Sequence, residues 1–204
     1  PKILKLVKFK KKTIDTKKSF FEKMRFERYD NPNNQVEPLS SYVKALRKGI
    51  PKDGILVTDM TTVAYYSRSY YQTYKTRSYF TSSYSGNLGS AFPTALGAKI
   101  ATPDKVVVSI SGDGGFLFNV QELATAVQYK INTISIIFND QSYGNVKRDM
   151  KKMFNNKVLG ADLINPDFIK LAESFGAVGM KAKNPKELED TLKQAISLNK
   201  PVVI

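Results

Sequence analysis

Two runs of β-branched residues, each followed at once by a polar turn, constrain the fold of this chain most strongly. The runs at 105–111 and 133–138 lack the alternation of a half-exposed strand, which is typical of strands buried on both faces of a parallel sheet. A segment with helical spacing of apolar residues, 118–129, separates them. This order of strand, helix and strand predicts a βαβ unit whose two strands end at the same edge of one sheet.

The same alternation of strand and helix patterns extends over residues 36–204. The spacing of apolar residues predicts further helices at 36–46, 61–71, 96–101, 166–175 and 185–198, and short apolar runs predict further strands at 54–59, 177–181 and 202–204. Alternating elements of this kind form parallel sheets. We therefore expect an α/β domain with a doubly wound, mainly parallel sheet that carries helices on both faces.

The lysine-rich stretch 1–34 does not share this alternation. It is weakly periodic and ends in the turn-forming run Asp30-Asn31-Pro32-Asn33-Asn34. We interpret residues 1–34 as a linker or arm and residues 35–204 as one domain. Because the last predicted strand starts only at residue 202, we expect this domain to be part of a longer chain.

The residues that the chain lacks exclude several kinds of chemistry. It has no cysteine and no histidine, which excludes disulfides and thiolate metal sites and removes the usual zinc ligand and general base. Catalysis would have to use carboxylates, hydroxyl groups, the backbone or a cofactor. No apolar stretch approaches the roughly 20 residues of a membrane span and the N-terminus lacks the apolar core of a secretory signal, so we expect a cytoplasmic protein without a membrane partner.

The net charge of +14 allows an anionic ligand, a nucleic acid or a membrane surface as partner. Several lysines crowd the N-terminal stretch without interleaved stacking aromatic residues: Lys8, Lys10, Lys11, Lys12, Lys17 and Lys18. Such a run is usually a solvated segment, and we expect no nucleic-acid partner. A basic nucleic-acid-binding domain stays as an alternative, which predicts an affinity that falls steeply with salt concentration.

Two aspartates follow the two best predicted strands. Asp113 stands in the run Gly112-Asp113-Gly114-Gly115 after the first strand, and Asp140 follows Asn139 after the second, 27 residues later. Because neighbouring parallel strands end at one edge of the sheet, we expect both carboxylates to meet there. Oxygen ligands are what a hard divalent cation that holds a diphosphate requires. Either motif alone is also a common turn after a strand.

In combination, these motifs resemble the signature of thiamine-diphosphate enzymes, which is Gly-Asp-Gly followed at this interval by paired asparagines. Residues 86–98 resemble the segment that approaches the cofactor in acetolactate synthases and benzoylformate decarboxylases, and residues 118–126 are similar to the helix after the signature. The likeness covers residues 36–204. It implies the C-terminal diphosphate-binding domain of such an enzyme, with thiamine diphosphate and Mg²⁺ as cofactors.

The resemblance also implies a set of site residues. The carboxylates of Asp113 and Asp140 and the backbone carbonyl of Ser142 would bind Mg²⁺. The residues expected to contact the cofactor are Thr61, Thr62, Gly86, Leu88, Gly112, Asp113, Gly114, Gly115, Asp140, Ser142, Tyr143, Gly144 and Asn145. The glycines after the first strand would let backbone amides approach the phosphates, and a loop at 143–145 would close over the other side. Threonines such as Thr61 and Thr62 more often only cap a helix.

Two of these positions bear on catalysis and on metal binding. Leu88 occupies the place where the family has a large aliphatic residue beneath the bent cofactor, and we predict a catalytic role in propping the aminopyrimidine against the thiazolium. A core leucine is the plainer interpretation. Leucine there resembles benzoylformate decarboxylases, whereas acetolactate synthases commonly have methionine. Asp140 replaces the usual asparagine and adds a negative charge beside the diphosphate.

A reaction and partners follow from the same resemblance. The expected enzyme decarboxylates a 2-oxo acid and, like an acetolactate synthase, can join the product to a second carbonyl compound; these motifs do not separate decarboxylase from synthase. It would be a homodimer or homotetramer, because in such enzymes a glutamate on the pyrimidine-binding domain of a neighbouring subunit activates the cofactor. That glutamate is not identifiable in this chain, so we expect the chain alone to be incomplete and inactive.

Two further alternatives stay open. A non-catalytic diphosphate- or metal-binding module, or a regulatory one, could retain the fold and would bind Mg²⁺ without turnover. A dinucleotide-binding oxidoreductase would need Gly-x-Gly-x-x-Gly after a strand, and the sequence lacks that motif after every candidate strand.

Overall fold

The computed structural model describes residues 12–82 and 85–204. The chain divides into two compact units, Pro1–Val36 and Glu37–Ile204. Residues 1–11 of the predicted linker or arm, which include Lys8, Lys10 and Lys11, lie outside the described residues.

The first unit is helical where it is described. Helix α1 spans Lys12–Arg25, the π-helical turn η2 spans Phe26–Asp30 and the 3₁₀ turn η3 spans Pro32–Asn34. No helix was predicted here, because the stretch lacks an apolar stripe. Lysine, glutamate, methionine and arginine, which favour helices, make up much of α1, while its apolar side chains Phe20, Phe21 and Met24 are exposed. Intrinsic propensity therefore favours this helix, and its residues 18–25 are all exposed.

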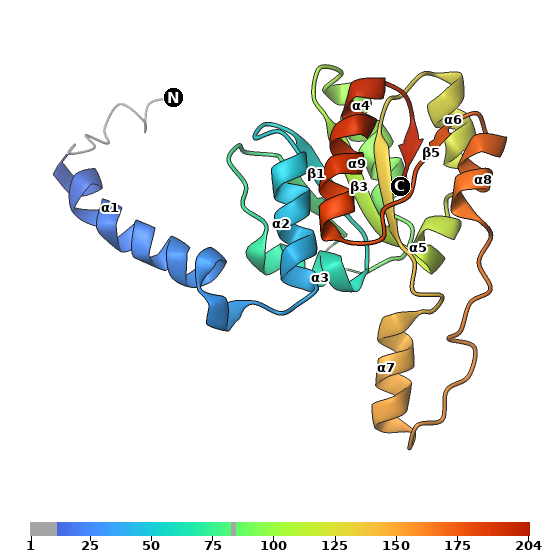
Figure 1. Ribbon diagram of the computed structural model, residues 1–204, viewed down its shortest axis with the longest axis horizontal. Coiled ribbons are helices and arrows are strands. Elements are labelled where there is room, and N and C mark those ends of the chain that lie inside the picture. The colour runs from blue at the N-terminus through green and yellow to red at the C-terminus, as the bar shows by residue number, and fades with distance from the viewer. Residues whose placement is uncertain (1–11, 83–84) are drawn as a thin grey trace. The chain divides into compact units, whose positions relative to one another are not determined.

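The second unit contains a six-stranded sheet in which every neighbouring pair of strands is parallel. The strands are β1 Ile55–Thr58, β2 Tyr79–Thr81, β3 Val107–Gly112, β4 Ile134–Phe138, β5 Val178–Gly179 and β6 Val202–Val203. Their order is β2-β1-β3-β4-β6-β5. Figure 1 labels β1, β3 and β5 of this sheet. The predicted parallel α/β fold is confirmed. The edge strand β2 was not predicted, because its three residues are partly exposed and show no buried run.

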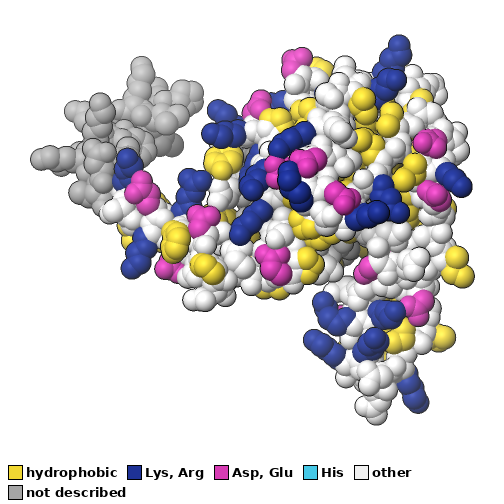
Figure 2. All heavy atoms as spheres, in the orientation of Figure 1, with side chains coloured by type: hydrophobic (Ala, Val, Ile, Leu, Met, Phe, Trp, Pro, Cys, Tyr) yellow, Lys and Arg dark blue, Asp and Glu magenta, His cyan; other side chains and the backbone are white. Residues whose placement is uncertain are grey.

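The helices of this unit are α2 Leu39–Gly49, α3 Thr62–Tyr70, α4 Ala91–Ala101, α5 Asp113–Leu117, α6 Glu122–Gln128, α7 Gly144–Met153, α8 Phe168–Ser174 and α9 Pro185–Leu198. Two of them were not predicted. α5 begins directly after β3, and α7 occupies a stretch in which only a polar, basic segment was recognised. No residue of α7 is buried, and Figure 2 shows Lys and Arg side chains on its surface. Among the described residues, no helix is both long and apolar enough to span a membrane.

Successive strand residues pack on opposite faces of the sheet. The core under α2, α3 and α9 takes the strand residues Leu56, Val108, Ile110, Ile134, Ile136 and Val202. The cores under α4, α5, α6 and α8 take Ile55, Val57, Val107, Ile137 and Val203. This period of two, with a core on each face, explains why β1 and β3 carry buried residues at almost every position. Helices therefore cover both faces of the sheet, as predicted.

The order of strands reverses between β1 and β3. From β1 the chain moves outward to β2, and it then returns to place β3 and β4 on the opposite side of β1. In open α/β sheets, ligands bind at the carboxyl ends of the strands beside such a reversal. The segments that follow β1, β3 and β4 meet at this edge, and they begin with Asp59, Asp113 and Asn139.

Candidate functional site

A cavity of about 220 Å³ lies at the carboxyl ends of β1, β3 and β4. Twelve of the thirteen predicted cofactor-binding residues line it: Thr61, Thr62, Gly86, Leu88, Gly112, Asp113, Gly115, Asp140, Ser142, Tyr143, Gly144 and Asn145. They come from four separate segments of the chain. The fold thus brings together motifs that the sequence presents tens of residues apart.

The remaining residue, Gly114, is not among the residues that line this cavity. It is buried, and a Cβ placed on it would collide with the ring of Tyr143 and come within 3.0 Å of Cδ1 of Leu163. Gly114 therefore allows Tyr143 to pack against the start of α5. The geometry gives it a packing role, and its contact with a cofactor stays a prediction.

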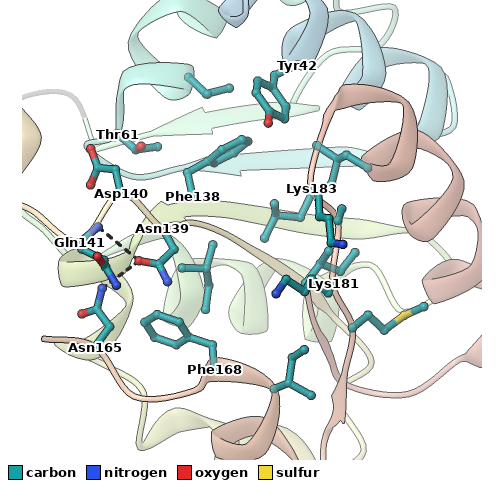
Figure 3. Close-up of a pocket in the computed structure, with 18 of the residues that line it drawn as sticks. Tyr42, Thr61, Phe138, Asn139, Asp140, Gln141, Asn165, Phe168, Lys181 and Lys183 are labelled. Carbon is teal, nitrogen blue, oxygen red and sulfur yellow. Dashed lines mark hydrogen bonds between the residues drawn. The ribbon is translucent and has the colours of Figure 1, made fainter.

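Asp113 stands at the tip of β3 and is 1% exposed. Its Oδ2 accepts a hydrogen bond of 2.6 Å from Nδ2 of Asn165. The same Nδ2 donates to Oδ1 of Asn139 over 2.9 Å (Figure 3). Asn165 lies between α7 and α8, 52 residues after Asp113, and was not predicted as a site residue. No local sequence pattern marks a contact over that separation.

The loop after β4 carries the other two predicted metal ligands. Asp140 is exposed, and its Oδ1 accepts a hydrogen bond of 3.2 Å from the backbone N–H of Ser142. Residues 141–143 pair in antiparallel fashion with residues 161–163, through two backbone hydrogen bonds of 2.8 Å and a bridge at Ser142. This pairing holds the backbone of Ser142, whose carbonyl is the predicted third ligand.

The predicted loop at 143–145 is the start of a helix. Tyr143 is the N-cap residue of α7, and Gly144 begins the helix. A Cβ on Gly144 would lie 2.8 Å from Oδ2 of Asp140, so the glycine leaves room for that carboxylate. Backbone N–H groups in the first turn of a helix have no intrahelical acceptor and favour anions. The segment is therefore a helix start and not a loop, and its free backbone N–H groups suit a phosphate.

Leu88 lines the cavity from the turn that precedes α4. This turn depends on Gly89, whose φ is 82° and where a Cβ would lie 2.7 Å from Cβ of Phe118. The N–H of Gly89 donates to Oδ2 of Asp59 over 2.8 Å, and its carbonyl accepts a hydrogen bond of 2.8 Å from Nδ2 of Asn119. Gly89 is held at both its polar groups, and this fixes the backbone beside Leu88.

A comparison with known protein families identifies this arrangement. The family described as thiamine pyrophosphate enzyme, C-terminal TPP binding domain, matches residues 59–204, which include every segment of the cavity wall. The chain belongs to this family. Thiamine pyrophosphate is thiamine diphosphate, so the cofactor that the sequence motifs implied is the one that names the family.

Individual relatives of this TPP-binding domain are acetolactate synthases. It is 36% identical over 175 residues to an acetolactate synthase of Bacillus subtilis (strain 168), a match that covers 86% of this chain and 30% of that protein. It is 34% identical over 174 residues to a probable acetolactate synthase large subunit of Methanococcus aeolicus, covering 85% of this chain and 29% of that protein. The chain thus spans less than a third of the length of these relatives.

A solved structure gives the same result for the fold of the TPP-binding domain. The thiamine diphosphate-dependent 4-hydroxybenzoylformate decarboxylase of Rhodococcus jostii RHA1 superposes with a TM-score of 0.75 at 30% sequence identity. The match covers 83% of this chain and 32% of that chain. The predicted resemblance to both acetolactate synthases and benzoylformate-type decarboxylases is therefore confirmed.

Asp59 is a second buried carboxylate at the edge of the site, and it was not predicted as a site residue. It is fully buried; its Oδ1 accepts from the N–H of Met60 over 2.8 Å, and its Oδ2 accepts from Gly89 and, over 3.5 Å, from Oγ of Ser111. Burial raises the pKa of Asp59, and the hydrogen bonds from backbone N–H groups oppose this rise. Asp113 was marked by its place at the end of a predicted strand, and Asp59 is the last residue of the strand predicted at 54–59, so the same signal could have identified it.

The donor set of the cavity fits a magnesium diphosphate. Two carboxylates and a backbone carbonyl are the hard oxygen ligands that Mg²⁺ prefers, with waters and phosphate oxygens to complete its shell. Among the residues that the structure describes, no three Asp, Glu, His or Cys side chains gather as a metal site. The cavity is smaller than the roughly 300–1,000 Å³ of sites for whole ligands. It therefore suits one end of the cofactor.

A larger cavity of about 710 Å³ adjoins the first. Figure 3 shows Lys181 and Lys183 in its wall, on the far side from Asn139 and Asp140. Phe138 and Asp140 line both cavities. The tip of the loop after β4 thus borders open space in two directions, and its position depends on hydrogen bonds more than on packing.

Proposed function

We propose that this domain binds thiamine diphosphate through a Mg²⁺ ion in the cavity at the ends of β1, β3 and β4. The observation that carries the proposal is that Asp113, Asp140 and Ser142 line one cavity, beside the reversal of strand order, in a member of a TPP-binding family. If these motifs were only ordinary turns after strands, we would not expect the three predicted metal ligands to line the same cavity.

Each residue of the metal site has a chemical role in this proposal. Asp113 and Asp140 supply carboxylate oxygens, and Ser142 supplies its backbone carbonyl. Asp140 gives the site one negative charge more than the asparagine usual in the family would. This charge strengthens the attraction for Mg²⁺ and weakens that for the diphosphate, and the basic surface of α7 offsets part of the repulsion.

The remaining residues of the wall bind and orient the cofactor. Gly112 leaves the approach to the backbone open, because the nearest atom to a Cβ built there would be 3.7 Å away on Thr61. Thr61 and Thr62 offer hydroxyl groups at the same end, where the first turn of α7 offers backbone N–H groups. Leu88 supports the cofactor from the turn that Gly89 fixes. When bound, thiamine diphosphate supplies the electron sink that loss of CO₂ from a 2-oxo acid requires.

The whole enzyme, by this proposal, is an acetolactate synthase-like 2-oxo acid decarboxylase or carboligase that works as a homo-oligomer. Two observations support a partner domain. The chain spans less than a third of the length of its relatives, and its cavity has room for only part of a ligand of this size. A pyrimidine-binding domain of a neighbouring subunit would complete the site and bring the activating glutamate.

Calorimetric titration of thiamine diphosphate into this chain, with and without Mg²⁺, tests the proposed binding. We expect binding that requires Mg²⁺, and we expect Asp113→Ala to weaken it by at least about tenfold. Asp113→Asn keeps the size of the buried side chain and should also weaken binding, which separates loss of a ligand from loss of packing. Asp190→Ala, an exposed carboxylate on α9, serves as the matched control. Binding that is independent of Mg²⁺, or that is unchanged in both Asp113 variants, would overturn the proposal.

Turnover is tested on the full-length protein, with pyruvate and with 4-hydroxybenzoylformate as the two probe substrates. Release of CO₂ from either substrate supports an enzyme, and the preferred substrate separates the synthase-like from the decarboxylase-like assignment. Mg²⁺-dependent binding without release of CO₂ from either would favour the alternative of a non-catalytic module that retained the fold.

A further inference from the structure

We propose that Asn165 is a positioning residue that sets the carboxylate of Asp113 and the tip of the loop after β4 for metal binding. This inference rests on the proposed function and adds a residue to it. Asn165 belongs neither to the Gly-Asp-Gly motif nor to the Asn139-Asp140 pair, and it lies in the segment between α7 and α8.

The contacts of Asn165 connect the ends of two neighbouring strands. Its Nδ2 donates to Oδ2 of Asp113 over 2.6 Å and to Oδ1 of Asn139 over 2.9 Å. In the sheet, Gly112 pairs with Phe138, so Asp113 and Asn139 are the residues that follow this last pair. One amide group thus joins the tips of β3 and β4 just beyond the point where the pairing of the strands ends.

These contacts leave part of the Asp113 carboxylate for a metal ion. A carboxylate has two oxygens, and Asn165 engages Oδ2, so Oδ1 is available as a ligand while the plane of the group is held. A hydrogen bond to a charged acceptor is stronger than one between neutral groups. Residues that hold a metal-binding carboxylate in this way raise the affinity of the site without touching the ion.

The side-chain amide of Asn165 keeps its orientation although one of its polar atoms is left without a hydrogen bond. Its Oδ1 is buried and has no hydrogen-bond partner in the part of the chain that the structure describes. The opposite orientation would place that oxygen against the carboxylate of Asp113, so the donor must face the site. A buried acceptor without a partner is rare and calls for an explanation, for which a functional site is one of the common ones.

Packing alone does not hold the end of the loop after β4 in place, and the hydrogen bonds of Asn165 help to hold it. The tip at Asn139 and Asp140 borders two cavities, and Asp140 itself is exposed. The antiparallel pairing of 141–143 with 161–163 holds the backbone of the loop but does not reach Asp113. Asn165 follows this pairing by two residues, and it extends the restraint from the loop after β4 to the carboxylate at the tip of β3.

Asn165→Ala and Asn165→Asp, made in the full 204-residue chain, test this role. We expect Asn165→Ala to raise the Mg²⁺ concentration that half-saturates thiamine diphosphate binding by about tenfold. At saturating Mg²⁺, the affinity for thiamine diphosphate should change by less than about threefold, because Asn165 is not a ligand of the cofactor. Asn165→Asp should raise the Mg²⁺ requirement further, since it replaces a donor to Asp113 by a second negative charge.

Asn132→Ala is the matched control. Asn132 also makes a hydrogen bond from its side-chain amide to a distant asparagine, Asn199, but it precedes β4 at the opposite edge of the sheet. This variant should keep the Mg²⁺ requirement of the wild type. Binding of Mn²⁺ in the presence of thiamine diphosphate, followed by electron paramagnetic resonance, gives a second measure of metal affinity that does not depend on activity.

The outcomes separate this inference from the proposed function. If the wild type shows Mg²⁺-dependent binding and Asn165→Ala has the same Mg²⁺ requirement, the role of Asn165 is refuted and the proposed function stands. If Asn165→Ala weakens cofactor binding equally at low and at saturating Mg²⁺ and also lowers the unfolding temperature, Asn165 is merely structural and the inference fails. If the wild type itself binds thiamine diphosphate without Mg²⁺, both this inference and the proposed function are refuted.

Discussion

The two sides of the cofactor cavity are held by different physical means. Beside Leu88, the backbone of Gly89 is fixed by Asp59 and Asn119, and Gly89 itself is buried. On the metal side, Asp140 is exposed and borders two cavities. Hydrogen bonds hold both sides, but those of the Leu88 side hold the buried Gly89, whereas the loop after β4 on the metal side ends in an exposed tip.

This difference has a consequence for variants of the two sides. A change on the Leu88 side alters contacts that also stabilise the fold, so it should lower the free energy of unfolding. A change in the exposed part of the loop after β4, on the metal side, removes few buried contacts and should lower metal affinity while the fold persists. Stability and metal binding, measured on the same variants, therefore test whether the two sides differ as the structure indicates.

Gly89→Ala should have the largest effect on stability. Alanine would have to adopt a φ of 82° and place its Cβ 2.7 Å from Cβ of Phe118 and 2.9 Å from Nδ2 of Asn119. Backbone strain and overpacking together should lower the free energy of unfolding by about 2–4 kcal/mol. Urea denaturation monitored by circular dichroism measures this.

Gly97→Ala is the matched control for that substitution. Gly97 lies within α4, and a Cβ there meets no atom within 4 Å. Because alanine favours the helix more than glycine does, this variant should gain about 0.5–1 kcal/mol. A Gly89→Ala protein as stable as the wild type would show that the turn can relax and that the Leu88 side is not part of the core.

Asp59→Asn should have the next largest effect. The buried carboxylate accepts from the N–H groups of Met60 and Gly89, and an amide cannot accept with both of its atoms. Leaving a buried donor without an acceptor should lower the free energy of unfolding by roughly 1–3 kcal/mol. The loss is reduced at neutral pH, because asparagine also removes a buried charge.

The pH dependence of this variant follows from the pKa of Asp59. Burial raises that pKa above its usual value of 3.8, so the native state holds the proton more firmly than the unfolded state does. The stability that Asp59 contributes is then fully present below the unfolded pKa and is lost as the pH rises through the folded pKa. The advantage of the wild type over Asp59→Asn should therefore shrink as the pH rises above the unfolded pKa and through the raised folded pKa. An advantage that grows as the pH rises would contradict the raised pKa.

The sequence predicted the parts of the molecule that depend on local patterns. The strands β3 and β4 and the helix α9 follow from runs of β-branched residues and from apolar spacing, and the structure confirms them. Helix α7 was missed although Val146, Met150 and Met153 stand at helical spacing in it, since the segment is mostly polar and basic and buries no residue. Strand β2 was missed because it lies at the edge of the sheet and is only partly buried.

The same division applies to the site. The residues that line the cavity lie in short motifs, and the alternation of strands and helices places those motifs at one edge of the sheet. The contacts that hold the motifs in place were missed, even where a residue such as Asp59 stands at the end of a predicted strand. Asp59 bonds to Gly89 across 30 residues and Asn165 to Asp113 across 52, and no local pattern encodes a contact at such distances.

Gly144→Ala should have the smallest effect on stability and still weaken metal binding. Its Cβ would come within 2.8 Å of Oδ2 of Asp140, the end of an exposed side chain that can rotate away. The free energy of unfolding should change by less than about 0.5 kcal/mol. Because the carboxylate of Asp140 must move to admit the methyl group, the Mg²⁺ concentration needed for thiamine diphosphate binding should rise several-fold, whereas Gly97→Ala should leave it unchanged. A Gly144→Ala protein that loses as much stability as Gly89→Ala would show that the metal side is also part of the core, and the contrast between the two sides would no longer hold.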